Sequence, residues 1–260
     1  MESQLLPAML KQSLEQINLT GFAIVRDAIN GDRLRELCDA CQRIFVDPAL
    51  SQSAKSKSGH VYAARNLIHS IPLVQTIGFD GELGHLLTGV LGEAYGLVRV
   101  LYFDKPPDRT WSLAWHRDQA IAVRQHLADS GHLSRPTVKA GVPHMVASDA
   151  ILSQMLTLRL HLDAADEENG ALKVIPESHF SSVSPGKGIE NYELIRANPG
   201  DVLAMRPLII HSSGSSHPET KRHRRIIHLE FAATNELPDG FEWQHYIGRP
   251  GLREIDFRQT

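Results

Sequence analysis

Three features that mark large classes of protein are missing from this sequence: a long hydrophobic run, a strong net charge and an internal repeat. No apolar segment approaches the length of a membrane span, and residues 1–16 lack the continuous apolar stretch of a secretory signal. The formal net charge of -3 gives no electrostatic basis for binding nucleic acid. These absences favour a cytoplasmic protein that binds neither membranes nor nucleic acids, and they leave its oligomeric state open.

Cysteine is scarce, and its 2 copies do not have the setting of a redox site. Cys38 and Cys41 form a C-x-x-C pair, but both lie on an apolar stripe that repeats at helical spacing from Leu34 to Phe45. The helix start signal at residues 30–32 precedes this stripe. A thioredoxin-like or metal-binding C-x-x-C needs a strand–helix context that is missing here, so we interpret both cysteines as core residues of a helix.

What the sequence does contain is the composition of a single globular enzyme domain. Its 42% hydrophobic and 22% charged residues are ordinary for such a domain, and 260 residues can bury a full core. Residues 1 to about 95 are expected to be mostly helical around one early strand, about 96–235 to form the core, and 236–260 to be a C-terminal extension. Short strands separated by glycine and proline predict a mainly β fold with N-terminal helices, namely a cupin-like jelly roll or double-stranded β-helix.

The expected strands of this core follow the apolar patterns in its sequence. They lie at residues 97–103, 112–123, 156–162, 172–175, 202–210 and 226–231. The segment 124–148 has no such pattern, and long connections of this kind are usually lids or binding loops. We therefore expect it to cover the active site.

The most informative motif is the pair His116 and Asp118, which is followed far downstream by His211. Residues i and i+2 of a strand point to the same face, so His116 and Asp118 can reach one metal ion together. His211 comes at the end of the apolar run 202–210 and is expected to arrive on its own strand. Two imidazoles and one carboxylate can occupy one face of an iron(II) ion and leave the other positions to a cosubstrate and oxygen.

Other interpretations of this motif remain open. A chain with 14 histidines and 30 acidic residues can produce a His-x-Asp triplet by chance, as a surface or turn pair. The same ligand set also makes a catalytic zinc site, so a zinc hydrolase is an alternative. The tripeptide at residues 116–118 matches the catalytic loop of protein kinases as well, but Val123 stands where that loop requires asparagine.

A second signal is the alternation around the last expected strand. Arg224 and His228 share one face of it, and Ile227 and Leu229 share the other. The first face is expected to line a polar cavity and the second to pack against protein. An arginine in such a cavity is costly unless it binds an anion, and its planar fork suits a carboxylate.

Together these pieces resemble the phytanoyl-CoA dioxygenase family of iron(II)- and 2-oxoglutarate-dependent oxygenases. The resemblance covers most of the chain in the family's order, with matching pieces at residues 21–27, 116–118, 169–179, 199–201, 211–214 and 224. It implies that His116, Asp118 and His211 bind iron(II). It also implies that Arg224 holds the distal carboxylate of 2-oxoglutarate and that Ser213 assists the cosubstrate.

The sequence departs from the family in two places. The spacing from His211 to Arg224 is slightly longer than in the best-known members, so Arg222 is an alternative to Arg224. Arg159 stands where a family member has an aromatic residue, and it can meet the second carboxylate of 2-oxoglutarate or a carboxylate of the substrate if its face of the strand points inward.

Three further residues are candidate substrate contacts. His161 shares its strand face with Arg159, while Lys139 and His144 offer a cation and an imidazole in the expected lid. These two can recognise an anionic substrate, and the alternative is a solvated lysine beside a histidine that caps the loop.

The reaction implied by the resemblance is hydroxylation of a small molecule with O2, which releases succinate and CO2 from 2-oxoglutarate. Because Asp118 completes the ligand set, halogenation at a vacant carboxylate position is disfavoured. A cupin-like metal-binding protein and a 2-oxoglutarate sensor without hydroxylase activity remain alternatives. No motif selects the primary substrate, and the fold does not determine it.

Overall fold

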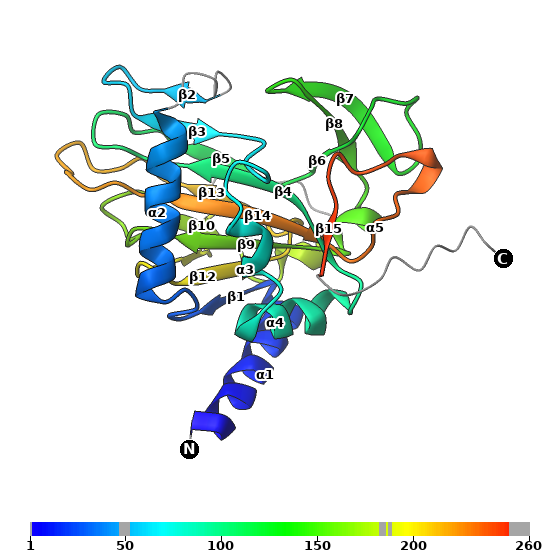
Figure 1. The fold of residues 1–260 in the computed structure, drawn as a ribbon, viewed down its shortest axis with the longest axis horizontal. Coiled ribbons are helices and arrows are strands. Elements are labelled where there is room, and N and C mark those ends of the chain that lie inside the picture. The colour runs from blue at the N-terminus through cyan, green and yellow to red at the C-terminus, as the bar shows by residue number, and fades with distance from the viewer. Residues whose placement is uncertain (1, 47–52, 182–185, 187–188, 250–260) are drawn as a thin grey trace.

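The computed structural model describes residues 2–46, 53–181, 186 and 189–249, and Figure 1 shows their arrangement. The α-helices are α1 (Glu2–Thr20), α2 (Gly31–Phe45), α3 (Val74–Ile77), α4 (Gly81–Leu91) and α5 (Asp149–Leu152), and the short 3-10 helices are η1 (Ser178–Phe180) and η2 (Pro238–Gly240). Within these described ranges no helix combines the length and the apolar character needed to cross a bilayer.

Two antiparallel sheets form the body of the molecule. The larger sheet has the order β1 (Phe22–Val25), β12 (Val202–Met205), β9 (Met155–His161), β14 (Ile226–Ala232), β4 (Gly96–Phe103), β3 (Val61–Ala64) and β2 (Ala54–Lys55), and β15 (Ile247–Gly248) also pairs with β4. The smaller sheet has the order β11 (Glu193–Leu194), β10 (Leu172–Val174), β13 (His211–Ser213) and β5 (Leu113–His116).

The order of the strands along the chain identifies the fold. From β4 to β14 the chain passes back and forth between the two sheets: β4, β9, β12 and β14 lie in the larger sheet, and β5, β10, β11 and β13 lie in the smaller one. This alternation is that of a jelly roll, or double-stranded β-helix. The expected mainly β fold with N-terminal helices is therefore confirmed.

The main core lies between the larger sheet and the helices. Strand β9 shows why, since Leu158 and Leu160 pack into this core while Arg159 and His161 point to the opposite face, toward the smaller sheet. On the helical side, α2 is capped by the side-chain oxygen of Asn30. Its buried face carries the two cysteines, with Cys41 buried and Cys38 half-buried, and both thiols are free.

The strand expected at residues 112–123 is interrupted in the structure. Strand β5 ends at His116 and the next strand, β6 (Ala120–Ala122), begins after three residues that leave the smaller sheet. In this break the backbone N–H of Asp118 donates to the carbonyl of Pro207 at 3.1 Å. Asp118 therefore lies on a connection and not on the strand of His116, a difference that residue alternation alone does not reveal.

The strand expected at residues 202–210 also divides in two. Strand β12 ends at Met205, a turn follows in which Ile209 N–H donates to the Arg206 carbonyl at 3.1 Å, and β13 begins at His211. The apolar run 202–210 thus contains a strand of the larger sheet and leads into a strand of the smaller sheet. A continuous run of buried residues is the same in sequence whether it forms one strand or two that meet at a corner.

The segment expected to be a lid, residues 124–148, contains two long strands. These are β7 (Leu133–Lys139) and β8 (Val142–Ala147), which form a third sheet with β6. The two-residue turn between them consists of Ala140 and Gly141, both with positive φ angles, of 50° and 75°. Figure 1 shows this green hairpin standing apart from the two large sheets.

The packing of the helices on the larger sheet predicts one strong effect on stability. Phe231 is fully buried, and its ring lies 6.2 Å from that of Phe79 and 6.1 Å from that of Tyr95. We expect Phe231→Ala to lower the free energy of unfolding, measured by urea denaturation, by about 3–5 kcal/mol because it leaves a cavity in this core. Phe180→Ala is the matched control, since that ring is 71% exposed and its loss is expected to cost less than about 0.5 kcal/mol. Equal effects of the two substitutions would contradict the assigned core.

Candidate metal centre

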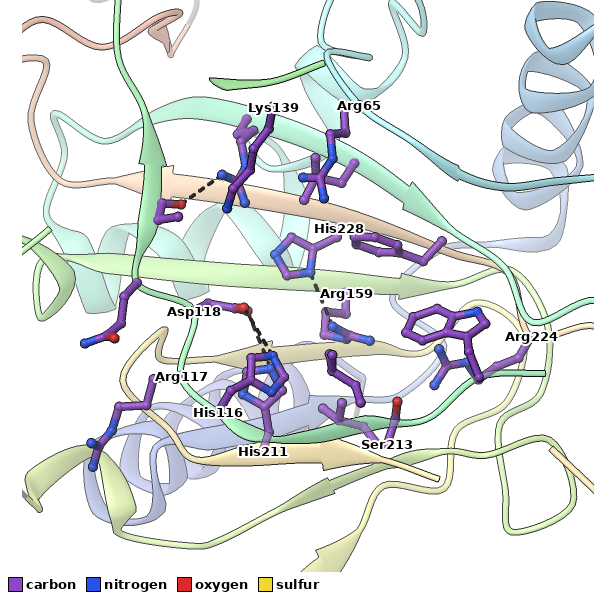
Figure 2. A pocket seen from close by; sticks show the side chains of 18 of the residues that line it. Arg65, His116, Arg117, Asp118, Lys139, Arg159, His211, Ser213, Arg224 and His228 are labelled. Atoms are coloured by element: carbon purple, nitrogen blue, oxygen red, sulfur yellow. Dashed lines mark hydrogen bonds and ion pairs between the residues drawn. The ribbon is translucent and has the colours of Figure 1, made fainter. Parts of the chain in front are cut away.

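Three side chains converge between the two large sheets (Figure 2). Ligand atoms of His116, Asp118 and His211 all lie within 4.8 Å of one another. The Asp118 carboxylate lies between the imidazoles, with Oδ1 3.7 Å from His116 Nε2 and Oδ2 3.6 Å from His211 Nε2. Two nitrogen donors and one oxygen donor thus lie close enough together to hold one divalent transition metal.

The strand register explains why the two histidines meet. Strands β5 and β13 pair antiparallel with His116 directly opposite His211, and the two ring centroids are 4.2 Å apart. Directly opposed residues of antiparallel strands point to the same face. Both imidazoles therefore lie on the face of the smaller sheet that is turned toward the larger sheet.

Hydrogen bonds to the backbone orient both rings. Nδ1 of His116 donates to the carbonyl of Ala114 at 2.8 Å, and Nδ1 of His211 donates to the carbonyl of Ile209 at 3.0 Å. A proton held at Nδ1 leaves the lone pair of Nε2 free, and Nε2 is the atom that faces Asp118 in each ring. Both imidazoles therefore have the tautomer that binds a metal through Nε2.

The ionisation states of the group also suit a cation. Burial lowers the pKa of His211 to about 4, so its ring is neutral at neutral pH. Burial alone raises the pKa of Asp118, but the neighbouring histidines and Arg159 outweigh it and hold that pKa well below the usual range. Metal binding would therefore displace no proton from either group near pH 7.

A cavity of about 510 Å³ opens beside these three residues. Its wall is drawn from all three sheets and consists of Arg65, Arg99, Leu101, Phe103, Trp111, Leu113, His116, Arg117, Asp118, Gln119, Ala120, Lys139, Val146, Arg159, Leu172, His211, Ser213, Arg224 and His228. Among the described residues, this wall has one carboxylate, that of Asp118, and six arginines and lysines. The cavity therefore suits an anionic occupant.

Arg224, which lines the cavity, and Lys105, which is fully buried beside it, both donate hydrogen bonds to one backbone carbonyl. Arg224 is 3% exposed and donates from Nη1 to the Gly170 carbonyl at 2.8 Å, while its Nε has no partner within the described chain. Lys105 is 0% exposed and donates to the same carbonyl at 3.1 Å, to Ser213 Oγ at 3.2 Å and to the Gly214 carbonyl. Ser213 thus belongs to the same group.

Burial and neighbouring positive charges lower the pKa of both side chains. Burial, with the nearby charges of Arg224 and Arg159, lowers the pKa of Lys105 to about 6. Burial and Arg159 lower the pKa of Arg224 to about 9. An anion placed between them would reverse these shifts.

Sequence reasoning missed Lys105 because it lies two residues beyond the end of β4. The signal that could have found it is the alternation of that strand, since Leu101 and Phe103 line the cavity and one further step along the chain reaches Lys105.

Arg159 and Arg99 occupy the cavity wall formed by the larger sheet. Arg159 contacts Nδ1 of His228 at 3.4 Å, and within the described residues it has no ion pair. Arg99 differs, because it pairs with Glu230 at 2.7 Å, and Glu230 also contacts His228 at 3.2 Å. Arg159 therefore points into the cavity, as considered from the sequence. Among the described residues, no carboxylate forms an ion pair with its guanidinium group.

The alternative arginine, Arg222, is bound elsewhere. It pairs with Asp166 at 2.8 Å and with Glu168 at 3.1 Å, and it does not line the cavity. Arg224, by contrast, points into the cavity (Figure 2). The structure thus separates the two candidates by their partners.

Of the three candidate substrate contacts, the structure brings only Lys139 to the cavity wall. His144 is buried beside its own strand, where Nδ1 donates to the carbonyl of Val142 at 2.9 Å. His161 is buried against the Asp201 carbonyl at 3.3 Å, beyond the cavity. Burial lowers the pKa of both rings, to about 4 for His144 and about 3 for His161.

Several solved structures share this fold. EctD from S. alaskensis, crystallised with 2-oxoglutarate and 5-hydroxyectoine, has a TM-score of 0.65 and 16% identity over 85% of this chain and 75% of its own. SnoN, a non-heme alpha ketoglutarate dependent epimerase from nogalamycin biosynthesis, has a TM-score of 0.63 and 15% identity over 87% of this chain and 81% of its own. AviO1 from Streptomyces viridochromogenes Tue57 has a TM-score of 0.58 and 20% identity over 85% and 94% of the two chains. At these identities the similarity establishes the fold.

Comparison by sequence adds the family. No curated protein matches the chain. The family model for phytanoyl-CoA dioxygenase (PhyH), however, matches residues 17–225, a span that includes the three converging side chains and Arg224. This chain therefore belongs to the phytanoyl-CoA dioxygenase family.

Proposed function

We propose that this protein is a single-domain iron(II)- and 2-oxoglutarate-dependent dioxygenase that hydroxylates a small molecule and releases succinate and CO2. The observation that carries this proposal is one cavity with two kinds of anchor. One is the His-Asp-His group, and the other is a pair of buried cations, Arg159 near that group and Arg224 farther away, neither of which has an ion pair among the described residues. Family membership supports the same class of enzyme.

His116, Asp118 and His211 would hold the iron. Two imidazole nitrogens and the ionised carboxylate of Asp118 would supply three donor atoms on one side of the ion. Bound iron(II) would supply the activation of O2, a reaction that no side chain of this cavity can perform.

Arg224, Lys105 and Ser213 would bind the distal carboxylate of 2-oxoglutarate. A buried guanidinium is costly without a counter-charge, and here the available protein partner is the Gly170 carbonyl. Arg159 lies near enough to Asp118 to influence its pKa, so it would meet the carboxylate at the metal end of the cosubstrate. A dicarboxylate therefore matches the cations at both places.

The remaining wall would orient the substrate and limit access of water. Leu101, Phe103 and Trp111 provide apolar surface beside the candidate cosubstrate site. Such surface excludes water from the reacting atoms, which protects an oxidising centre from side reactions. A zinc hydrolase would use the same three ligands but would give no role to Arg224.

One prediction of this proposal concerns the complex with iron(II) and 2-oxoglutarate. We expect the purified protein without oxygen to develop a visible charge-transfer band when iron(II) and then 2-oxoglutarate are added. His116→Ala should abolish the band. Arg224→Ala should raise the 2-oxoglutarate concentration needed for half of the band by about 10- to 100-fold, since hydrogen bonds to charged groups contribute about 1.5–3 kcal/mol.

Arg222→Ala is the matched control, because it removes the same charge two residues away from a side chain that pairs with Asp166 and Glu168. It should leave the titration unchanged. A metal-loaded protein without the band would favour a zinc hydrolase or a cupin-like metal protein. A band without any decarboxylation of 2-oxoglutarate in air would favour a sensor.

Another prediction of this proposal follows from the low pKa of Lys105. With its pKa near 6, Lys105 is largely neutral at pH 8 in the free protein. A carboxylate bound beside it favours the charged form and raises that pKa, so 2-oxoglutarate should bind with uptake of a proton at pH 8. The uptake should fade below pH 6, where Lys105 is already charged before binding.

Calorimetry of the iron-loaded protein without oxygen, in two buffers of different ionisation enthalpy, measures this uptake. Lys105→Met should remove it while keeping an apolar side chain of similar length. Equal proton uptake by the wild type and Lys105→Met would show that Lys105 does not meet the cosubstrate.

A further inference from the structure

Two cations of the cavity wall take no part in the arrangement described so far. Arg65 directly follows β3, and Lys139 is the last residue of β7. Both side chains line the cavity and are half-buried. Within the described chain neither makes a hydrogen bond or an ion pair.

A hydrogen bond between their neighbours holds these two cations near each other. The side-chain amide of Asn66, next to Arg65, donates to the carbonyl of Ala140, next to Lys139, at 3.0 Å. Through this bond the tip of the β7–β8 hairpin is attached to the segment that follows β3. The two positive side chains are thus placed in advance, although they repel each other.

The carboxylates near them already have other partners. Glu230 pairs with Arg99 at 2.7 Å, and Asp118, whose charge also acts on Lys139, lies between the imidazoles of His116 and His211. Arg99 lies close enough to repel both Arg65 and Lys139, and burial together with this repulsion lowers the pKa of each. Two positive charges therefore remain without a counter-charge.

Their position separates them from the candidate 2-oxoglutarate site. In Figure 2, Arg65 and Lys139 point into the cavity from the top of the view, whereas His116, His211, Arg224 and Ser213 lie below them. The carboxylates of 2-oxoglutarate are already matched by Arg224, Lys105 and Arg159. An anion at Arg65 and Lys139 would belong to a second molecule.

We propose that Arg65 and Lys139 bind an oxyanion, either a carboxylate or a phosphate, of the primary substrate. This proposal rests on the function proposed above and adds the substrate class, a small molecule with one anionic end. The fork of Arg65 and the ammonium group of Lys139 both suit such a group. The part of the substrate to be oxidised then extends from this anchor toward the iron site, along the apolar side chains of Leu101 and Phe103.

The test is calorimetric titration of the protein loaded with iron(II) and saturating 2-oxoglutarate, without oxygen. The probes are phenyl phosphate, benzoate and benzyl alcohol, which share a ring and differ in charge. We expect at least one of the two anions to bind at least tenfold more tightly than the alcohol. The preferred anion then identifies the oxyanion, phosphate or carboxylate, that the site takes.

Substitutions assign the binding to the two residues. Arg65→Gln and Lys139→Gln should each weaken binding of the preferred anion at least tenfold and leave the charge-transfer band of the 2-oxoglutarate complex unchanged. Arg135→Gln is the matched control, because Arg135 lies on the same strand, β7, but is exposed and outside the cavity. The Arg135→Gln substitution removes the same charge, and the variant should bind the anion as tightly as the wild type does.

Several results would overturn the proposal. These are equal affinity for the alcohol and both anions, absence of anion binding in the wild type, and anion binding by both glutamine variants that matches Arg135→Gln. In each case an intact charge-transfer band would leave the dioxygenase assignment standing. Loss of that band in the wild type would instead reject the dioxygenase. If Arg65→Gln fails to fold, Lys139→Gln at the hairpin end still decides the outcome.

Discussion

The pairing of β5 with β13 is the constraint on which the rest of the site depends. Its register sets His116 opposite His211, so two residues far apart in the chain are joined by an ordinary antiparallel ladder. A shift of one residue would turn one imidazole to the other face of the sheet. The interruption after His116 belongs to the same constraint, because the chain leaves the ladder there and the bond from Asp118 N–H to the Pro207 carbonyl positions the carboxylate between the rings.

The space between the two large sheets contains an apolar cluster and a cavity lined by positive charges. One part is filled by a compact apolar cluster that includes Leu172, Val174 and Leu203, and the other is the cationic cavity. The boundary passes near Gly170, whose carbonyl accepts hydrogen bonds from both Arg224 and Lys105. Gly170 has a φ of 69°, and a side chain there would collide with the Gly214 carbonyl, so only glycine allows the backbone to approach both cations. The buried side chains of Arg224 and Lys105 thus have a main-chain carbonyl oxygen as a hydrogen-bond acceptor.

Features with a strict period could be predicted from the sequence, and features made by contacts between distant segments could not. The alternation of leucine with Arg159 and His161 gave both faces of β9 correctly, because the strand is continuous and its two faces meet different surroundings. The strands of the β7–β8 hairpin could not be predicted, since most of β7 is exposed and has no apolar period. Arg65 escaped notice for a different reason: it lies just beyond a short strand, and its place on the cavity wall depends on the bond between Asn66 and Ala140.

Both histidines of the triad are oriented by carbonyls of their own strands, at Ala114 and Ile209. Among the residues that the structure describes, no other side chain forms a hydrogen bond to either ring. Residues elsewhere on the cavity wall can therefore change without disturbing the imidazoles. During evolution, this independence would allow a protein of this architecture to acquire new substrates by exchanging residues on the third sheet and β4, while the geometry of the metal centre is inherited unchanged.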